Sequence, residues 1–315
     1  MKSIVKLSIL ISIIFVAGCK SDKSMNTDAK APIAEKQAKE LSIHNSTRTD
    51  NYFWMRLTDE QKNAAESDSQ TKDVLSYLNE ENAYLDAKMK HTKKFQKELF
   101  EEITSRIKQD DESVPFYKNG YLYYSRFEKG EDYGLNCRKK ENEKSEEEII
   151  INQPELANGE SYFALGGMSV SPDNKLAAYS TDLISRREYT IFIKNIETGK
   201  VYNDKIEQTT GGITWANDNK TIFYTKKDPV TLRSNKIYRH TIGTSQKEDI
   251  LVFEERDETF GCGVSKTKSN KYLIIGSYQT LSSEIRFLDA DNPNGEWKII
   301  LPREENHEYS VNHFG

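Results

Sequence analysis

The residues that could perform nucleophilic chemistry in this chain do not form a recognisable motif. A serine nucleophile of the α/β-hydrolase type needs a strained Gly-x-Ser-x-Gly turn that exposes its hydroxyl beside backbone N–H donors. The nearest string, Gly167-Met-Ser-Val-Ser171, lacks the second glycine. A serine nucleophile also needs a histidine base that a carboxylate orients, and the histidines are scattered at His44, His91, His240, His307 and His313. We therefore expect Ser169 to be structural, each histidine to be solvated or hydrogen-bonded, and no catalytic residue to be present.

Signals for a metal or a cofactor are weak. The segment Asp289–Gly295 begins like a calcium-binding loop, but Pro293 stands where a ligand is needed and the glycine comes one place late. The string Gly261-Cys-Gly263 has no third glycine and no following helical segment, both of which a dinucleotide-binding loop requires. We expect a hairpin turn at the first position, and neither a metal nor a cofactor.

Adjacent carboxylates can hold a cationic substrate group, and they occur at Glu80-Glu81, Glu146-Glu147 and Glu254-Glu255. The chain contains 50 acidic residues, so such pairs arise readily by chance. Solvated faces are therefore the simpler interpretation of all three. Arg126 is a conceivable contact to a substrate or another domain, with a salt bridge at a sheet edge as the alternative. Substrate-binding residues stay unassigned at this point.

The amino-terminal stretch predicts export and lipidation. A basic start precedes the apolar run Leu7–Ala17, which is shorter than the roughly 20 residues that span a bilayer but suits a secretory signal. The overlapping string Val16-Ala-Gly-Cys19 resembles the lipobox of bacterial lipoproteins, in which the cysteine is acylated. We expect a lipoprotein signal peptide over residues 1–19, a flexible tether over 20–46, and a protein held in the bacterial cell envelope only through its lipid. An ordinary signal peptide or an uncleaved anchor is the alternative.

Composition limits the remaining possibilities. At 36% hydrophobic and 30% charged residues, with a net charge of −5, the chain is typical of a polar soluble protein of two domains, and nothing favours nucleic acid. The two other cysteines, Cys137 and Cys262, could pair in an oxidising compartment. We predict instead that they are small, buried apolar residues.

A repeat organises the carboxy-terminal two thirds of the chain. Lys175, Lys220 and Lys271 hold the same place in three copies of a strand, turn and strand pattern, at intervals of 45 and 51 residues. A fainter copy covers residues 118–151, and Tyr309–Gly315 repeats the lead-in to that copy. Periods of this length are typical of β-propeller blades. The sequence predicts a mainly β fold, with an incomplete propeller of four blades and part of a fifth over residues 112–315; unrelated hairpins in a sandwich are the alternative.

Residues 47–111 differ in composition from the repeat. Apolar residues recur there at intervals of three, four or seven, which is the pattern of an amphipathic helix. They are Leu75, Leu78, Leu85 and Met89, then Phe95, Leu99, Ile103 and Ile107. We predict an α-helical segment with two helices, roughly 72–89 and 93–108.

Several separate strings along residues 47–315 resemble, in the same order, the amino-terminal half of oligopeptidase B, in the prolyl oligopeptidase family of serine peptidases. These strings are Asp50–Arg56, Tyr77–Tyr84, Glu101–Pro115, Tyr123–Phe127 and Lys227–Arg233. The resemblance implies a seven-bladed propeller and a carboxy-terminal α/β-hydrolase domain carrying Ser, Asp and His, onto which the helices would pack. That catalytic domain is absent from this sequence, so we expect a chain truncated before it and carry over no catalytic residue.

Three functional interpretations remain open. The resemblance implies the propeller of an oligopeptidase B-like endopeptidase that cleaves short peptides after Arg or Lys, with the propeller acting as a size filter. The alternatives are a non-catalytic lipoprotein propeller that binds a ligand or partner, and a dipeptidyl-peptidase-like relative, in which a carboxylate pair on the propeller binds a free amine. The helical stripe favours the first interpretation over the second. The strings Arg106–Asp111 and Lys227–Arg233 favour it over the third.

Overall fold

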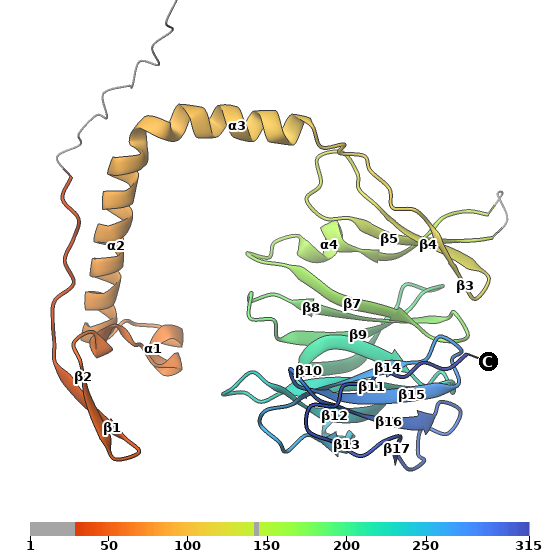
Figure 1. Ribbon diagram of the computed structural model, residues 1–315. Helices are drawn as coiled ribbons and strands as arrows, with labels where there is room; N and C mark the ends of the chain where they lie inside the picture. Colours follow the sequence, from red (N-terminus) through yellow and green to blue (C-terminus); the bar gives the residue numbers. More distant parts are fainter. Residues whose placement is uncertain (1–28, 142–144, 315) are drawn as a thin grey trace, which may run out of the picture. The chain divides into compact units, whose positions relative to one another are not determined.

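The computed structural model describes residues 29–141 and 145–314. Cys19 and the predicted signal peptide lie outside the described residues. The chain divides into two compact units, Met1–Ile107 and Lys108–Gly315, so the boundary falls slightly before the predicted one at 111/112. Within the described part, every helix is too short or too polar to cross a membrane. Each unit is described separately below (Figure 1).

The first unit opens with a hairpin of β1 (Lys39–Ile43) and β2 (Ser46–Asp50). Its two-residue turn has positive φ at His44 (50°) and Asn45 (60°), the geometry that matches the twist of the flanking strands. β1 lies inside the range predicted to be a flexible tether. Both strands are mostly exposed, and β2 carries no apolar residue, so only Leu41 and Ile43 of β1 give a short hydrophobic alternation.

Three α-helices follow the hairpin: α1 (Asp59–Asn63), α2 (Ser69–Met89) and α3 (Lys93–Ser105). α1 begins with a capping box, in which the Thr58 hydroxyl accepts from the Gln61 N–H and the Gln61 side chain accepts from the Thr58 N–H. α2 begins earlier than the periodicity predicts because the Asp68 carboxylate accepts from the Thr71 N–H and caps it there.

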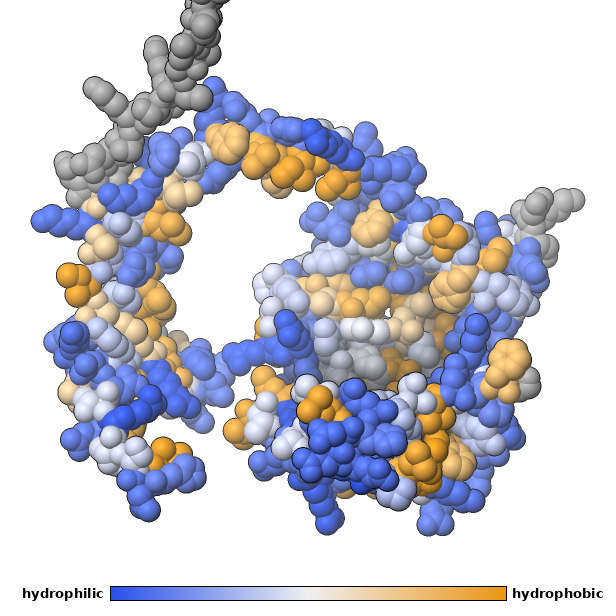
Figure 2. All heavy atoms as spheres, viewed as in Figure 1, coloured by the Kyte–Doolittle hydropathy of each residue, from blue (hydrophilic) through white to orange (hydrophobic). Residues whose placement is uncertain are grey.

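The apolar stripe predicted for these helices is present and is exposed. All eight of its side chains, from Leu75 to Ile107, are between 39% and 63% exposed. Figure 2 shows apolar residues gathered along one side of α3 and continuing on α2. Burying a Leu, Ile or Phe side chain is worth about 1.5–3 kcal/mol, so this stripe is a surface that gains much from being covered.

The second unit consists of three antiparallel sheets in which strands that follow one another in the chain pair with one another. The first sheet comprises β3 (Phe116–Lys118), β4 (Tyr121–Arg126), β5 (Leu135–Lys140) and β6 (Glu148–Asn152). α4 (Gln153–Ala157) leads to the second sheet, of β7 (Ala164–Val170), β8 (Leu176–Asp182), β9 (Tyr189–Asn195), β10 (Val201–Trp215), β11 (Thr221–Lys227), β12 (Ser234–Thr241) and β13 (Ile250–Glu254). The third sheet comprises β14 (Gly261–Lys266), β15 (Tyr272–Tyr278), β16 (Ser283–Asp289) and β17 (Lys298–Ile299).

The seven-stranded sheet is two four-stranded meanders that share β10. The first part of β10, up to Thr209, pairs with β9, whereas its last part, Thr209–Trp215, pairs with β11. The register shifts on both sides of Thr209, and Gly211 there has φ of 90°, which a residue with a Cβ adopts only with strain. One long strand therefore bends from one meander into the next. Independent hairpins in a sandwich do not describe this arrangement.

The repeated lysines lie in equivalent turns, each between the first and second strands of a meander. The residue before each lysine is an asparagine with positive φ: Asn174 (64°), Asn219 (58°) and Asn270 (59°). Asn119 (49°) holds the same place in the first sheet. Asparagine tolerates this left-handed conformation better than other residues with a Cβ. The spacing found in the sequence is therefore a repeat of turn geometry.

Three apolar clusters lie between successive meanders, and neighbouring residues of one strand serve different clusters. Ala177 packs with the first sheet, whereas Ala178 packs with the next meander. Tyr224 belongs to that second cluster and Phe223 to a third, against β14–β16. Successive side chains of a strand point to opposite faces, so strands covered on both sides need apolar residues throughout. This explains the continuous apolar runs of β8 and β11.

The two described cysteines are free and buried, as predicted. Cys137 lies in β5 and Cys262 in β14. Burial, with a smaller contribution from a nearby glutamate, raises the pKa of each thiol to about 12. Both therefore behave as small apolar residues at neutral pH.

Candidate functional site

A cavity of about 930 Å³ is lined by the first strands of the four meanders, β3, β7, β10 and β14, and by the turns that follow them. We call it the inner cavity. Its walls carry large apolar side chains, among them Phe116, Tyr117, Val170, Trp215 and Val264. Every meander thus contributes its first strand to one common space.

Hydrogen bonds between neighbouring meanders hold the walls of the inner cavity together. The Trp215 indole N–H donates to the Ser169 carbonyl at 2.9 Å and so ties β10 to β7. The Thr214 hydroxyl donates to the Val264 carbonyl at 3.1 Å and ties β10 to β14. Ser169 therefore contributes its backbone carbonyl to the cavity wall, and it lies in β7 rather than in a strand-to-helix turn.

All charged residues among those that line the inner cavity are lysines: Lys118, Lys266 and Lys268. Lys266 is half-buried at the end of β14, and its ammonium group donates to the Asn217 side-chain oxygen. Burial, and to a smaller extent the charge of Lys118, lower the pKa of Lys266 to about 8 against the opposing effect of Asp291 and Asp218. The cavity can therefore accept a ligand with an anionic group and apolar flanks.

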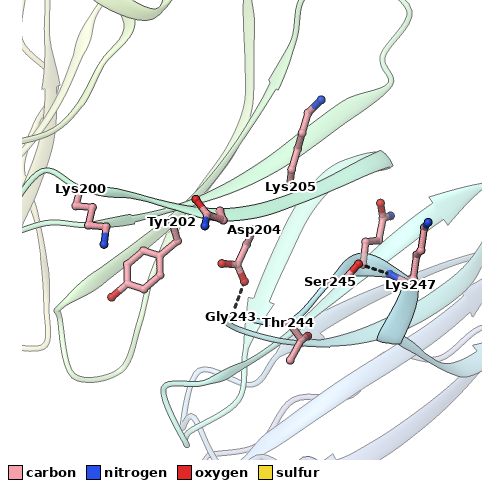
Figure 3. A pocket seen from close by; sticks show the side chains of 10 residues that line it. Lys200, Tyr202, Asp204, Lys205, Gly243, Thr244, Ser245 and Lys247 are labelled. Atoms are coloured by element: carbon pink, nitrogen blue, oxygen red, sulfur yellow. Dashed lines mark hydrogen bonds between the residues drawn. The ribbon is translucent and has the colours of Figure 1, made fainter.

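A second pocket, of about 570 Å³, lies where β10 passes the turn after β12 (Figure 3). Tyr202 and three lysines, Lys200, Lys205 and Lys247, line it. The Asp204 carboxylate points to the Gly243 N–H, which donates to it at 2.5 Å. The Asp204 carboxylate in this pocket is therefore already hydrogen-bonded within the protein.

Beneath this second pocket, His240 lies between two carboxylates. Its Nε2 is 2.9 Å from Asp204 Oδ1 and its Nδ1 is 2.6 Å from Asp249 Oδ1, and the imidazole is completely buried. The Tyr224 hydroxyl donates to the other Asp249 oxygen at 2.8 Å. Burial lowers the pKa of His240, but the bonds to Asp249 and Asp204 outweigh it and raise the pKa above its ordinary value. All partners of this histidine are structural groups of β10–β12 and the following turn.

The structure places one serine beside a histidine. The Ser269 hydroxyl lies 2.8 Å from His313 Nδ1, and the His313 ring packs edge-on against Tyr272. Among residues 29–141 and 145–314, no carboxylate bonds to the other nitrogen of His313, so the pair lacks the third member of a triad. Ser269 also lies in a β-turn rather than at a strand-to-helix elbow. His44, His91 and His307 lie in exposed turns or at a helix end.

The prediction of solvated faces is wrong for one of the three carboxylate pairs, because Glu255 is buried, whereas Glu147 is exposed and paired with Arg126. Glu147 accepts three bonds from Arg126, of 2.8, 3.1 and 3.1 Å, and one from the Tyr124 hydroxyl at 2.6 Å. Glu255 is 4% exposed and pairs with Arg303 at 2.7 Å. The salt bridge proposed for Arg126 is confirmed. The partner of Glu255 is 48 residues away in the chain, and no sequence pattern connects the two.

Comparison with known proteins gives a consistent result. The family model described as the prolyl oligopeptidase, N-terminal beta-propeller domain, matches residues 32–315. A dipeptidyl aminopeptidase BI from Pseudoxanthomonas mexicana is 36% identical over 90% of this chain, and Protease 2 from Moraxella lacunata is 28% identical over 90%. The structure of oligopeptidase B from Leishmania major aligns with 91% of this chain at 30% identity and a TM-score of 0.82. The chain covers 40%, 41% and 42% of these three proteins, respectively.

Proposed function

The chain belongs to the prolyl oligopeptidase family, and from this premise we propose that it is the propeller portion of an oligopeptidase B-like serine endopeptidase. The observation that carries the proposal is the family match over residues 32–315, together with four meanders that each contribute a first strand to one cavity. The whole enzyme would cleave short peptides after basic residues. The propeller would admit short chains and exclude folded proteins.

In this proposal each meander is one blade of a seven-bladed propeller, and Tyr309–Gly315 begins a fifth. The repeat of asparagine turns supports the count, because the four turns are equivalent in geometry. The exposed apolar stripe of α2 and α3 would be covered by a catalytic α/β-hydrolase domain. This chain matches 40% of the length of the dipeptidyl aminopeptidase BI, and the remaining 60% leaves room for such a domain in the whole enzyme.

A dipeptidyl aminopeptidase function is the second candidate, because the relative that is 36% identical carries that name. Such an enzyme needs a group that binds the free amine of its substrate. Glu147 and Glu255 do not suit this role, since arginines already occupy both carboxylates. We therefore place the endopeptidase first.

The test compares two proteins: the 315-residue chain, and the product of the whole reading frame that contains it. We expect the longer protein to hydrolyse a fluorogenic Arg-Arg peptide with a blocked amino terminus, and a serine-reactive phosphonate to abolish this turnover. The 315-residue chain should show none, because its described part offers no nucleophile, base and oxyanion hole within hydrogen-bond reach of one another.

Two outcomes would contradict the proposal. If the longer protein cleaves only substrates with a free amino terminus, the dipeptidyl aminopeptidase function replaces the endopeptidase. If the 315-residue chain itself has a phosphonate-sensitive activity that survives repurification, it is a complete enzyme. A folded protein with an Arg-Arg sequence in a surface loop serves as the size control and should remain uncut.

We also propose that Cys19 is acylated and anchors the protein in the bacterial cell envelope. The apolar run that ends two residues before it, and the small residues Ala17 and Gly18 that precede it, support this assignment. We expect Cys19→Ser to abolish labelling by a fatty-acid analogue in cells. Cys137→Ser is the matched control and should label normally, because that thiol is buried in β5. Undiminished labelling of the Cys19 variant would refute the assignment.

A further inference from the structure

We propose that Lys118, Lys266 and Lys268 form an oxyanion-binding site in the inner cavity, and that its ligand is the terminal carboxylate of a short peptide. The anion site stands on the cavity alone. Its assignment to peptides rests on the function proposed above. These lysines come from β3, the end of β14 and the turn after it.

The first argument is the charge of the cavity. The chain as a whole carries a net charge of −5, yet the charged groups among the described lining residues are all positive. Among the described residues, no carboxylate lies within ion-pair distance of any of the three ammonium groups. Lys271, a few residues further along the same turn, differs: it contacts Asp289 at 3.4 Å and Asp291 at 3.8 Å. In the part of the chain that the structure describes, the three lysines that line the cavity therefore carry no ion pair that would compete with a bound anion.

The second argument concerns the nearest acidic groups, which are already engaged. Asp291 Oδ1 accepts from the Asn217 side chain at 2.7 Å. Asp218 accepts from the backbone N–H groups of Lys220 and Thr221, at 3.0 and 2.9 Å, and from the Thr221 hydroxyl. The half-buried Lys266 is left with a neutral amide oxygen as its partner and with Lys118 as a like charge. Placing a cation there costs stability, and a bound oxyanion would offset this cost.

The third argument selects a peptide over an inorganic anion. Phe116, Tyr117, Trp215, Val170 and Val264 form apolar walls beside the lysines. Inorganic phosphate has no apolar group that could pack against these walls. The side chains next to the carboxylate of a peptide can pack against them. β3 and β14 are also the end strands of their sheets. Backbone groups at a sheet edge can bond to an extended peptide.

The experiment measures binding of two acetylated tetrapeptides to the 315-residue chain by titration calorimetry. One tetrapeptide ends in a free carboxylate, the other in an amide, and inorganic phosphate is titrated separately. We expect the free acid to bind and the amide to bind roughly tenfold to a hundredfold more weakly, because a hydrogen bond to a charged group is lost. Added salt should weaken the binding of the free-acid peptide and leave the binding of the amide peptide unchanged.

Lys266→Met and Lys118→Met should each reduce the affinity for the free acid by a similar factor. Lys200→Met is the matched control, since it removes one lysine charge from the other pocket. The thermal midpoint of Lys266→Met should be unchanged or higher, because an unpaired, half-buried charge is removed. A lower midpoint would assign a structural role to Lys266 and overturn its role in the site.

Equal binding of the acid and the amide would overturn the site. Phosphate binding more tightly than the free acid would overturn its assignment to peptides. Neither result would affect peptidase activity of the longer protein, so failure of this inference is distinguishable from failure of the proposed function.

Discussion

Replacing His240 with glutamine is expected to lower the free energy of unfolding by about 3–5 kcal/mol at mildly acidic pH, the range typical of breaking a buried ion pair. The imidazole is fully buried and bonds at once to Asp204 and Asp249. Glutamine can satisfy one carboxylate and leaves the other buried without its cation. Two segments 45 residues apart would lose their common partner.

The effect of His240 depends on pH in a defined direction. Burial lowers the pKa of His240, but Asp249 and Asp204 raise it more, so the pKa in the folded protein lies above the ordinary 6.5. A group whose pKa is raised on folding stabilises the protein fully below its unfolded pKa. This contribution is lost as pH rises through the folded pKa. The difference between the wild type and His240→Gln should therefore be largest below pH 6.5 and shrink above it.

Urea unfolding at a series of pH values measures this difference. His307→Gln is the matched control, because that imidazole is largely exposed and should change stability by less than about 0.5 kcal/mol at any pH. If the His240→Gln variant is as stable as the wild type at pH 6, burial of the Asp204 and Asp249 carboxylates does not require a protonated His240 between them.

Replacing Arg303 with methionine is expected to cost about 3–5 kcal/mol as well, with the opposite dependence on pH. Arg303 bonds to Glu255 at 2.7 Å and stacks over the Phe260 ring at 3.7 Å. It also contacts Asp257 at 3.5 Å and Glu284 at 3.6 Å. Methionine would keep part of the stacking but leave the buried Glu255 carboxylate without its cation.

Burial raises the pKa of Glu255, but the bonds from Arg303 and the Asp257 N–H outweigh it and hold the pKa below the ordinary 4.5. Such a group stabilises the fold above its unfolded pKa and loses this contribution as pH falls through the folded pKa. The cost of Arg303→Met should therefore be complete at neutral pH and diminish below pH 4.5. Stability of the wild type should be highest between the two transitions.

Arg256→Met provides the control for the second variant. Its side chain is 87% exposed and contacts Glu254 at 3.6 Å, so it is expected to cost about 0–1 kcal/mol. Thermal unfolding monitored by circular dichroism distinguishes these values readily. Equal costs for Arg256→Met and Arg303→Met would show that Glu255 finds another partner when Arg303 is removed.

Local signals in the sequence predicted much of the architecture. The recurrence of Lys175, Lys220 and Lys271 located the turns, because each follows an asparagine that can adopt positive φ. Apolar periodicity located α2 and α3 to within a few residues, since an amphipathic helix leaves its period in the sequence. The missing Gly-x-Ser-x-Gly turn agrees with the place of Ser169 within β7. All of these are properties of a few consecutive residues.

Tertiary structure alone decided the sites. Lys118 and Lys266 are 148 residues apart, yet both line the inner cavity because each lies on the first strand of a meander. His240 lies between Asp204 and Asp249, and Arg303 bonds to Glu255, with no spacing rule behind either contact. The hairpin of β1 and β2 was missed because its strands are short and mostly exposed, and β2 carries no apolar residue. The sequence by itself determined where the strands and turns lie, because these depend on residues that are neighbours in the chain. The pairing of charged residues was decided only by the stacking of the meanders, because stacking brings together residues that are far apart in the chain.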